Sequence, residues 1–267
     1  AVALPLATKA KVPFIAPFTG AMALRNPFNR YAFHVRASYN DETALIVNQL
    51  RNVGLTKVAV MYQNDAYGKA GLDGVQLALA KHNLKPVAIA TVERNSVDVA
   101  KAVETINAAS PEAVVQISAY TSCAAYIRAA RKAGYGGGFY NVSFVGTQAL
   151  ADELGKFGAG VVVSQVVPSP YSGGKAISRE FADAVRRSNG AVQSNYSSME
   201  GYIAAKVLAE GLRRSGGKGG ADGLMTALES INNMSMGGFN VNFSKADHVA
   251  STFVEMSMLT GDGKVRV

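Results

Sequence analysis

The chain has 267 residues, of which 48% are hydrophobic and 17% charged. This composition supplies enough apolar surface for a sizeable core and excludes a disordered chain, and the length suggests about two domains. The 27 Lys and Arg residues outnumber the 19 Asp and Glu residues, but they are scattered, which argues against nucleic-acid binding. The longest charge-free stretches contain glycine clusters and prolines, so we expect no membrane-spanning helix.

Apolar strand-like runs alternate with amphipathic runs from Val12 onward, which is typical of an α/β fold with a mostly parallel sheet. A helix-like segment opens the chain. The expected strands lie at 12–17, 31–37, 57–63, 86–92, 112–118, 139–145 and 160–167. The expected helices lie at 40–52, 98–109, 120–133, 175–188 and 197–215, and short strands follow Gly238. Gly54, Gly134 and Gly216 fall where left-handed helix C-caps are expected.

The series of strands and helices from Lys57 to Val167 is long enough for one complete doubly wound sheet. A segment rich in proline and glycine, residues 166–175, then breaks the alternation, and two long helices follow with little strand between them. We therefore predict two lobes. One is complete, and the other is short of strands and is built from residues at both ends of the chain.

Motifs for catalysis, phosphate binding or dinucleotide binding do not occur in the sequence. His34, His82 and His248 are far apart and lack partners at helix spacing, so we predict no metal site. Cys123 lies among small apolar residues, where a buried inert thiol is expected. The sequence indicates no enzyme, no metal and no cofactor.

Polar and aromatic residues follow several of the expected strands. Thr19 follows the first strand, Tyr67 follows the strand at 57–63 behind a helix cap at Asn64 or Asp65, and Tyr120 follows 112–118. Because carboxyl ends of parallel strands meet at one sheet edge, these residues predict a small-ligand site there. Ordinary caps, turns and half-buried tyrosines remain the alternative interpretation of each residue.

The runs PLATKAKVPFIAPFTGA, NDAYGKAGL and SAYTSCAAYIRAARKAG, with the order of segments around them, resemble branched-chain-amino-acid-type (Leu/Ile/Val-binding-like) solute-binding proteins of bacterial ABC transporters. The resemblance covers essentially the whole chain. It implies a type I periplasmic binding protein fold: two lobes, each a mostly parallel sheet flanked by helices, which close on a ligand. It also implies a non-catalytic, periplasmic monomer without cofactor, which delivers a small-molecule carboxylate or amino acid to a membrane ABC permease.

The resemblance assigns residues 1–37 and 168–245 to lobe one and residues 38–167 and 246–267 to lobe two, with crossings near 36–38, 167–170 and 242–247. Family members carry about a hundred further residues ahead of the segment that resembles Ala1. Lobe one is therefore expected to be incomplete at its N-terminus. Two other functions remain open: a ligand-sensing module of a regulator or receptor on the same fold, and an α/β enzyme.

The resemblance also assigns ligand-binding residues by position. The loop of Phe18, Thr19 and Gly20 matches the one that holds the ligand carboxylate, and Tyr67 and Tyr120 match two lobe-two tyrosines that cover the ligand. Ser143 stands where amino-acid-binding members often place an acidic residue for the ammonium group, so a carboxylate without an amine, such as an aromatic acid, stays open. Gln165 and Glu200 are further candidates, and Glu200 would restore the missing charge.

Overall fold

The apolar run after Thr56 forms β3 (Val58–Gln63), which is buried along nearly its whole length. In the computed structural model, which describes residues 2–267, β3 belongs to a seven-stranded sheet. The strand order of the sheet is β11 (Lys264–Arg266), β10 (Glu255–Thr260), β7 (Val162–Gln165), β6 (Gly138–Asn141), β5 (Ala113–Ile117), β3 and β4 (Ala88–Val92). The five strands from β7 to β4 are parallel, and β10 and β11 join antiparallel.

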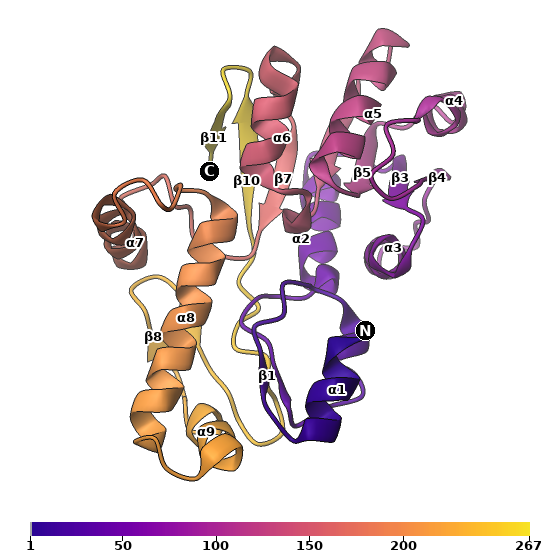
Figure 1. Ribbon diagram of the computed structural model, residues 1–267. Helices are drawn as coiled ribbons and strands as arrows, with labels where there is room; N and C mark the ends of the chain where they lie inside the picture. Colours follow the sequence, from indigo (N-terminus) through magenta and orange to yellow (C-terminus); the bar gives the residue numbers. More distant parts are fainter. Residues whose placement is uncertain (1) are drawn as a thin grey trace. The chain divides into compact units, whose positions relative to one another are not determined.

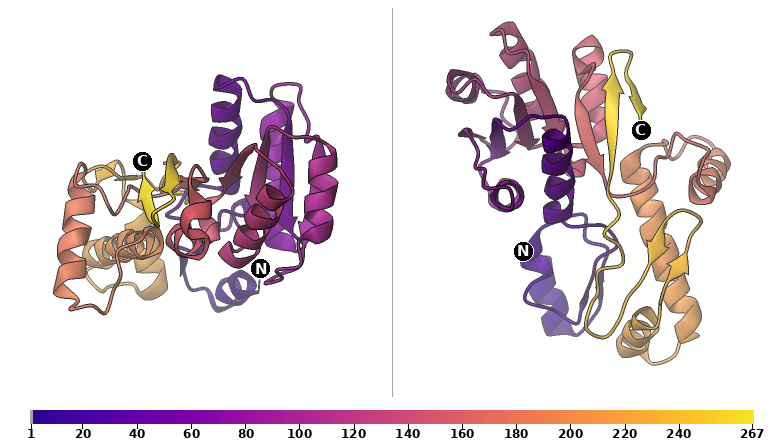
Figure 2. Two further views of the ribbon diagram at one scale, coloured as in Figure 1. Left: turned by 90° about the horizontal axis from the view of Figure 1, so that it is seen from above. Right: turned by 180° about the vertical axis from the view of Figure 1, so that it is seen from behind.

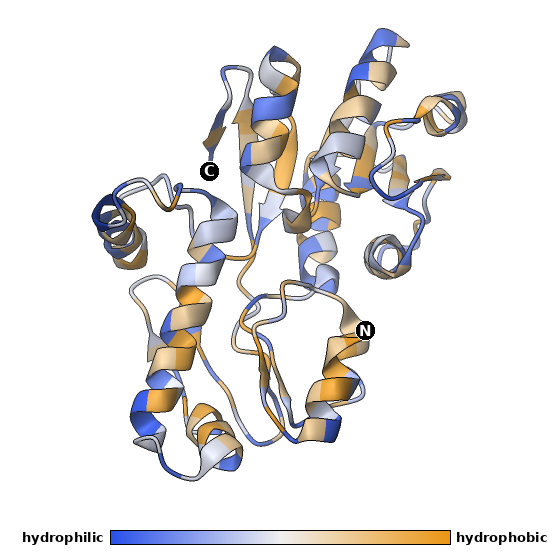
Figure 3. Ribbon diagram, viewed as in Figure 1, coloured by the Kyte–Doolittle hydropathy of each residue, from blue (hydrophilic) through white to orange (hydrophobic). Residues whose placement is uncertain are grey.

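Helices cover both faces of this sheet (Figure 1). On one side α2 (Tyr39–Asn52) packs against α3 (Ala66–Ala80), and on the other α4 (Ala100–Ala108), α5 (Tyr120–Lys132) and α6 (Thr147–Leu154) lie in a row. Burial on both faces explains why β5 is mainly an apolar run in the sequence, and β5 carries mainly hydrophobic colours in Figure 3. The α/β fold class is confirmed.

The sheet order reverses beside β3. The chain runs from β3 to β4 on one side and then returns to add β5 on the other side of β3. In doubly wound sheets ligands bind outside the carboxyl ends of the strands at such a reversal. The segments that follow β3 and β5, which carry Tyr67 and Tyr120, therefore occupy the edge where a ligand is expected.

The chain divides into two units, and the sheet just described belongs to unit 2, residues 39–165 and 254–267. Unit 1 comprises the described residues up to Ser38 together with residues 166–253. The sequence-based division placed residues 246–253 in the second lobe. In the structure they pack in unit 1, because Ala250 N donates to His34 O and Val249 forms a parallel bridge with His34.

Unit 1 has short strands and long helices (Figure 2). Its first part contains α1 (Ala3–Ala10), β1 (Phe14–Ile15), the 3-10 turn η1 (Met22–Leu24) and β2 (Ala32–Phe33), which pairs in parallel with β1. Its second part contains α7 (Ala176–Arg187), α8 (Tyr196–Ser215) and α9 (Gly220–Glu229), then the antiparallel pair β8 (Met234–Ser235) and β9 (Asn240–Val241). Two lobes, one short of strands, are what the sequence predicts.

Residues 139–145 are a partial error of the sequence interpretation. They were expected to form one strand, but β6 ends at Asn141 and residues 143–145 form a 3-10 turn, η2 (Ser143–Val145). The strand stops because Ser143 N donates to the carboxylate of Glu42 instead of to a neighbouring strand. The expected C-caps Gly54, Gly134 and Gly216 do have left-handed φ angles of 82°, 87° and 58°.

Candidate functional site

Tyr67 lies in the first turn of α3, directly after β3. Asp65 caps this helix, because its Oδ1 accepts hydrogen bonds from Tyr67 N at 3.0 Å and Gly68 N at 3.1 Å. Arg94 and Gln63 donate to the other carboxylate oxygen, Oδ2. Desolvation raises the pKa of Asp65, but the hydrogen bonds from Gly68, Arg94 and Gln63 outweigh it and hold the pKa below its usual value. Asp65 is therefore the cap that fixes the position of Tyr67.

Aromatic contacts tie Tyr67 to two other segments of unit 2. Its ring centroid lies 4.6 Å from that of Phe144, which follows β6, and 5.5 Å from that of Tyr39 at the start of α2. Ring contacts of this kind bury apolar surface and hold the rings in defined orientations. The ends of β3 and β6 thus share one aromatic cluster.

Tyr120 is the first residue of α5 and follows β5. Its side chain is 38% exposed, so it covers the surface of unit 2 rather than filling its core. A methyl group added at Gly146 would lie 4.0 Å from Tyr120 Cδ1, which places the tyrosine beside the loop that begins at Ser143. The structure therefore brings Tyr67, Tyr120 and Ser143 to one edge of the sheet.

Ser143 is held by Glu42, an acidic residue in the first turn of α2. Ser143 N donates to Glu42 Oε2 at 2.7 Å and Ser143 Oγ donates to Glu42 Oε1 at 3.0 Å. Ser164 Oγ adds a third hydrogen bond, to Oε2 at 2.6 Å. Glu42 is wholly buried, whereas Ser143 is partly exposed. A buried carboxylate accordingly lies directly behind the predicted ligand residue Ser143.

Gln165 lies at the end of β7 and is buried. Its Nε2 donates to Thr147 Oγ1 and to Ser257 Oγ, both at 2.8 Å. These bonds link β7 to α6 and β10 and give Gln165 a structural role in unit 2. A contact between Gln165 and ligand stays a prediction.

The loop of Phe18, Thr19 and Gly20 follows β1 in unit 1. Thr19 N donates to Pro17 O at 2.7 Å, and Thr19 Oγ1 accepts from Ala21 N at 3.2 Å, so the loop folds back on itself. Phe18 is 45% exposed, whereas Gly20 is buried. A hydroxyl that accepts one hydrogen bond can still donate its proton to a carboxylate. The local geometry is compatible with the carboxylate-binding role predicted for this loop.

Two arginines, of which Arg36 is buried, contact the Thr19 loop. Arg25 Nη2 donates to the carbonyl oxygens of Thr19, Arg36 and Ala37, at 3.4, 3.0 and 3.2 Å. Arg36 is 1% exposed, and its guanidinium carbon lies 5.2 Å from the centroid of the Phe18 ring. Its Nη1 also lies 3.7 Å from Glu200 Oε1. Glu200, from α8, thus directs its carboxylate at a cation of its own unit.

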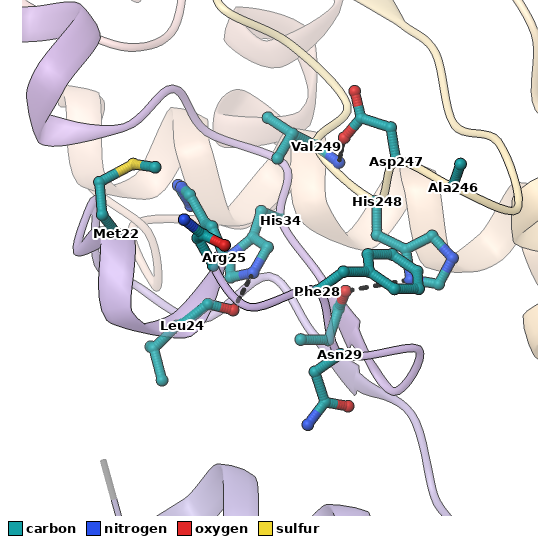
Figure 4. A pocket seen from close by; sticks show the side chains of 12 residues that line it. Met22, Leu24, Arg25, Phe28, Asn29, His34, Ala246, Asp247, His248 and Val249 are labelled. Carbon is teal, nitrogen blue, oxygen red and sulfur yellow. Dashed lines mark hydrogen bonds between the residues drawn. The ribbon is translucent and has the colours of Figure 1, made fainter.

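A hollow of about 280 Å³ in unit 1 lies away from the predicted ligand residues, because neither the Thr19 loop nor Glu200 lines it (Figure 4). His34 Nε2 donates to Leu24 O at 3.0 Å on one side, and His248 Nδ1 donates to Ala32 O at 3.2 Å on the other. Burial, followed by the charge of Arg25, lowers the pKa of His34 to about 4. These contacts hold the strands and loops of unit 1 together.

Arg36 and Glu42, which support the predicted ligand residues, differ in how far the sequence indicates their roles. Arg36 interrupts an apolar run, and a charge at such a position is expected to need an ion partner when it is buried. Glu42 has no such local signal, because its partners lie 101 and 122 residues away in the sequence. The interpretation of Cys123 as a buried thiol is confirmed, and burial raises its pKa.

Within residues 2–267, groups of three or more His, Cys, Asp or Glu side chains suited to a metal ion do not occur. In the same range, every helix is too short or too polar to cross a lipid bilayer.

A family model described as periplasmic binding protein matches residues 1–264. The chain belongs to this family. This periplasmic binding protein is similar in structure to a possible leucine/isoleucine/valine-binding protein from Rhodopirellula baltica SH 1, at 31% identity and a TM-score of 0.92 over 99% of this chain and 73% of that one. A substrate-binding periplasmic protein from Ralstonia solanacearum gives 28% identity and a TM-score of 0.89, over 98% of this chain and 75% of that one.

A third similar structure is a branched chain amino acid ABC transporter protein from Thermus thermophilus with bound valine. It shares 19% identity and a TM-score of 0.85, over 98% of this chain and 72% of that one, so this likeness concerns the fold alone. The comparison with curated proteins gave no match. The family resemblance and the two-lobed type I fold predicted for this periplasmic binding protein are confirmed, and family and fold are those of solute-binding proteins.

Proposed function

We propose that this protein is the periplasmic solute-binding component of an ABC transporter, which captures a small carboxylate-bearing ligand between its two units and passes it to a membrane permease. The family supports the solute-binding role, and the titles of the Rhodopirellula and Thermus proteins point to branched-chain amino acids or related acids. The observation that carries the proposal is the gathering of Tyr67, Tyr120 and Ser143 at the carboxyl edge of the unit 2 sheet.

Unit 1 contributes the carboxylate contacts in this proposal. The Thr19 hydroxyl is a neutral donor in this proposal, which suits a carboxylate without adding a formal charge. Arg25 holds the carbonyl side of the same loop and of residues 36 and 37. The loop is therefore fixed before ligand arrives, which lowers the entropy cost of binding.

Unit 2 contributes the contacts to the rest of the ligand. The exposed ring of Tyr120 offers an apolar face and a hydroxyl, and the Tyr67 ring is fixed by Phe144 and by the Asp65 cap. Such rings cover an aliphatic or aromatic side chain while their hydroxyls donate to a carboxylate. The same two tyrosines suit a branched-chain amino acid and an aromatic acid.

Binding in this proposal is a two-state closure without chemistry. The chain passes between the units at Ser38/Tyr39, Gln165/Val166 and Phe253/Val254. In this proposal these three crossing segments form the hinge. A ligand that contacts both units favours the closed state by its differential affinity. Removal of water strengthens the hydrogen bonds to a carboxylate, and a micromolar Kd corresponds to about 8 kcal/mol. We propose that the protein acts as a monomer.

A thermal-shift screen tests the proposal. The purified protein is heated with each of the L-amino acids and with aliphatic and aromatic carboxylates, and we expect at least one of them to raise Tm by roughly 5–10 °C at a hundred times its Kd. Thr19→Ala should weaken that ligand at least about tenfold, as loss of a charge-assisted hydrogen bond does. Thr56→Ala, at an exposed position ahead of β3, is the matched control. The absence of any carboxylate response would refute the proposal.

A further inference from the structure

We propose that unit 2 carries a second binding site, an open groove on the face of the sheet that α2 partly covers. The groove takes a medium-chain fatty acid, whose alkyl chain lies on an apolar floor and whose carboxylate lies at Arg266. The groove is separate from the predicted ligand site, because Tyr67, Tyr120 and Ser143 do not line it. The inference therefore does not rest on the proposed function.

The floor of the groove is a line of side chains across four neighbouring strands. Tyr140 in β6 stands opposite Val162 in β7, which stands opposite Met258 in β10. Met258 in turn stands opposite Arg266 in β11. Residues that pair in this way project from the same face of a sheet. Three apolar or aromatic side chains and one cation at the edge strand therefore share one face.

The alternation of side chains leaves this face of β10 and β11 open within unit 2. Met258 is 48% exposed, and Arg266 is exposed. The residues next to them, Leu259 and Val265, are buried on the other face, where α6 contacts β11. In the view from behind, α2 lies over the sheet, and β10 and β11 are seen without a described helix of unit 2 in front of them (Figure 2).

The groove has the size of a small amphipathic molecule. Its volume is about 460 Å³, and Gln49 of α2, Met256 and Val267 also line it. Four neighbouring strands span about 14 Å at a spacing of about 4.8 Å. An extended chain advances about 1.2 Å per bond, so a chain of about eight to ten carbons with its head group matches this line.

Arg266 determines the charge of the occupant. Lys264, on the same face of β11, already forms an ion pair with Asp262 at 2.9 Å. Within residues 2–267, by contrast, the side chain of Arg266 has no ion pair and no hydrogen bond. A guanidinium at the edge of an apolar surface suits an anionic head group, and a fatty acid carries this charge at the end of its chain. The groove thus favours an amphipathic anion over a cation.

Solution NMR of the protein with ¹³C-labelled methionine methyl groups locates the binding. The protein is titrated with hexanoate, octanoate and decanoate below their micelle-forming concentrations. We expect decanoate to shift the signals of Met256 and Met258 with a Kd of about 1 mM, as suits a small ligand in an open groove. Affinity should rise about two- to fourfold for each added methylene. Met234 and Met236, which line another hollow, in unit 1, report nonspecific binding.

Variants separate the charge from the apolar floor. Arg266→Gln should weaken decanoate about two- to fivefold, as loss of an exposed ion pair does. Arg266→Glu should invert the preference for charge, so that decyltrimethylammonium binds more tightly than decanoate. Met258→Thr shortens the floor and should weaken decanoate at least about threefold. Lys264→Gln is the matched control, because Lys264 is already paired, and it should change the Kd by less than about twofold.

Any of four results overturns the inference: no methionine signal shifts with decanoate, the shifts are confined to Met234 and Met236, decyltrimethylammonium binds the wild-type protein as tightly as decanoate, or Lys264→Gln and Arg266→Gln weaken binding equally. A dimer that sedimentation detects and Met258→Thr disrupts would also overturn it, since a second copy would then cover this face. Arg266→Gln should leave the carboxylate response of the thermal-shift screen unchanged, so that failure of this inference and failure of the proposed function are separate results.

Discussion

Arg36 and Glu200 form a buried ion pair in unit 1, in which 3.7 Å separates Arg36 Nη1 from Glu200 Oε1. Arg36 is 1% exposed and Glu200 8%, and the two side chains join the segment after β2 to α8. Removal of one member of a buried pair leaves the other charge in a poorly solvated place. The pair thus ties α8 to the segment after β2, which Arg25 also links to the Thr19 loop.

Substitution Arg36→Met should lower the free energy of unfolding by about 3–5 kcal/mol, because the carboxylate of Glu200 stays behind without this partner. Urea denaturation at neutral pH measures the change. The matched control is Arg186→Met, whose partner Asp183 lies on the exposed face of α7, and this variant should lose less than about 1 kcal/mol. Equal losses in the two variants would show that burial of the Arg36 pair has no energetic consequence.

Asp65→Ala should cost about 1 kcal/mol of stability through loss of the α3 cap, and should weaken ligand binding by releasing Tyr67. The pKa of Asp65 lies below its usual value in the folded protein, so the stability it contributes is present above the unfolded pKa of about 4 and is lost as pH falls further. Urea denaturation at pH 7 and at pH 3 measures the loss of stability and its dependence on pH. If the stability of Asp65→Ala has the same pH dependence as that of the wild type, protonation of Asp65 does not contribute to the acid destabilisation.

His34 should make unit 1 less stable in mild acid. Its folded pKa of about 4 lies below the unfolded value of about 6.5, so the unfolded chain takes up a proton first as pH falls and stability declines between these values. The full effect is on the order of 3 kcal/mol for a group this deeply buried. His34→Gln keeps a side-chain donor for Leu24 O and should flatten the dependence, as measured by thermal unfolding at pH 4.5, 5.5 and 6.5. A decline of the same slope in this variant would assign it to other groups.

Gly68 and Gly201 form a matched pair of helical glycines. A Cβ at Gly68 would lie 1.9 Å from Gln63 O, so Gly68→Ala must push α3 and Tyr67 away from β3 and should cost more than about 2 kcal/mol. Around Gly201, in α8, nothing lies within 4 Å of such an atom, so Gly201→Ala should stabilise by about 0.5–1 kcal/mol. Urea denaturation of both variants checks the signs, and a tolerated alanine at 68 would contradict the close packing of α3 on β3.

Sequence periodicity predicted most of unit 2, because its strands are apolar runs of the expected length and because Asp65, Gly54 and Gly134 mark helix ends. The expected cap at residue 64 or 65 is Asp65, and the expected strand at 112–118 is β5. Unit 1 was less predictable, since its strands are only two residues long and are defined by pairing rather than by pattern. Residues 246–253 show the same limit, because backbone pairing with His34, which is distant in the sequence, joins them to unit 1.

The sequence analysis named the candidate ligand residues but not the buried charged residues behind them. Tyr67, Tyr120 and Ser143 follow strands, and strand ends are visible in the sequence. Glu42 and Arg36 act through partners that are distant in the sequence, and a charge in a helix first turn or in an apolar run has several local explanations. Their roles follow from tertiary contacts, which no local pattern specifies.

The most direct test of this account is a crystal structure of the protein with the carboxylate that gives the largest thermal shift. We predict that a single bound molecule contacts the Thr19 loop of unit 1 and Tyr67 or Tyr120 of unit 2, with its carboxylate on the Thr19 hydroxyl. A molecule bound to one unit alone, or bound in the hollow beside His34, would contradict it.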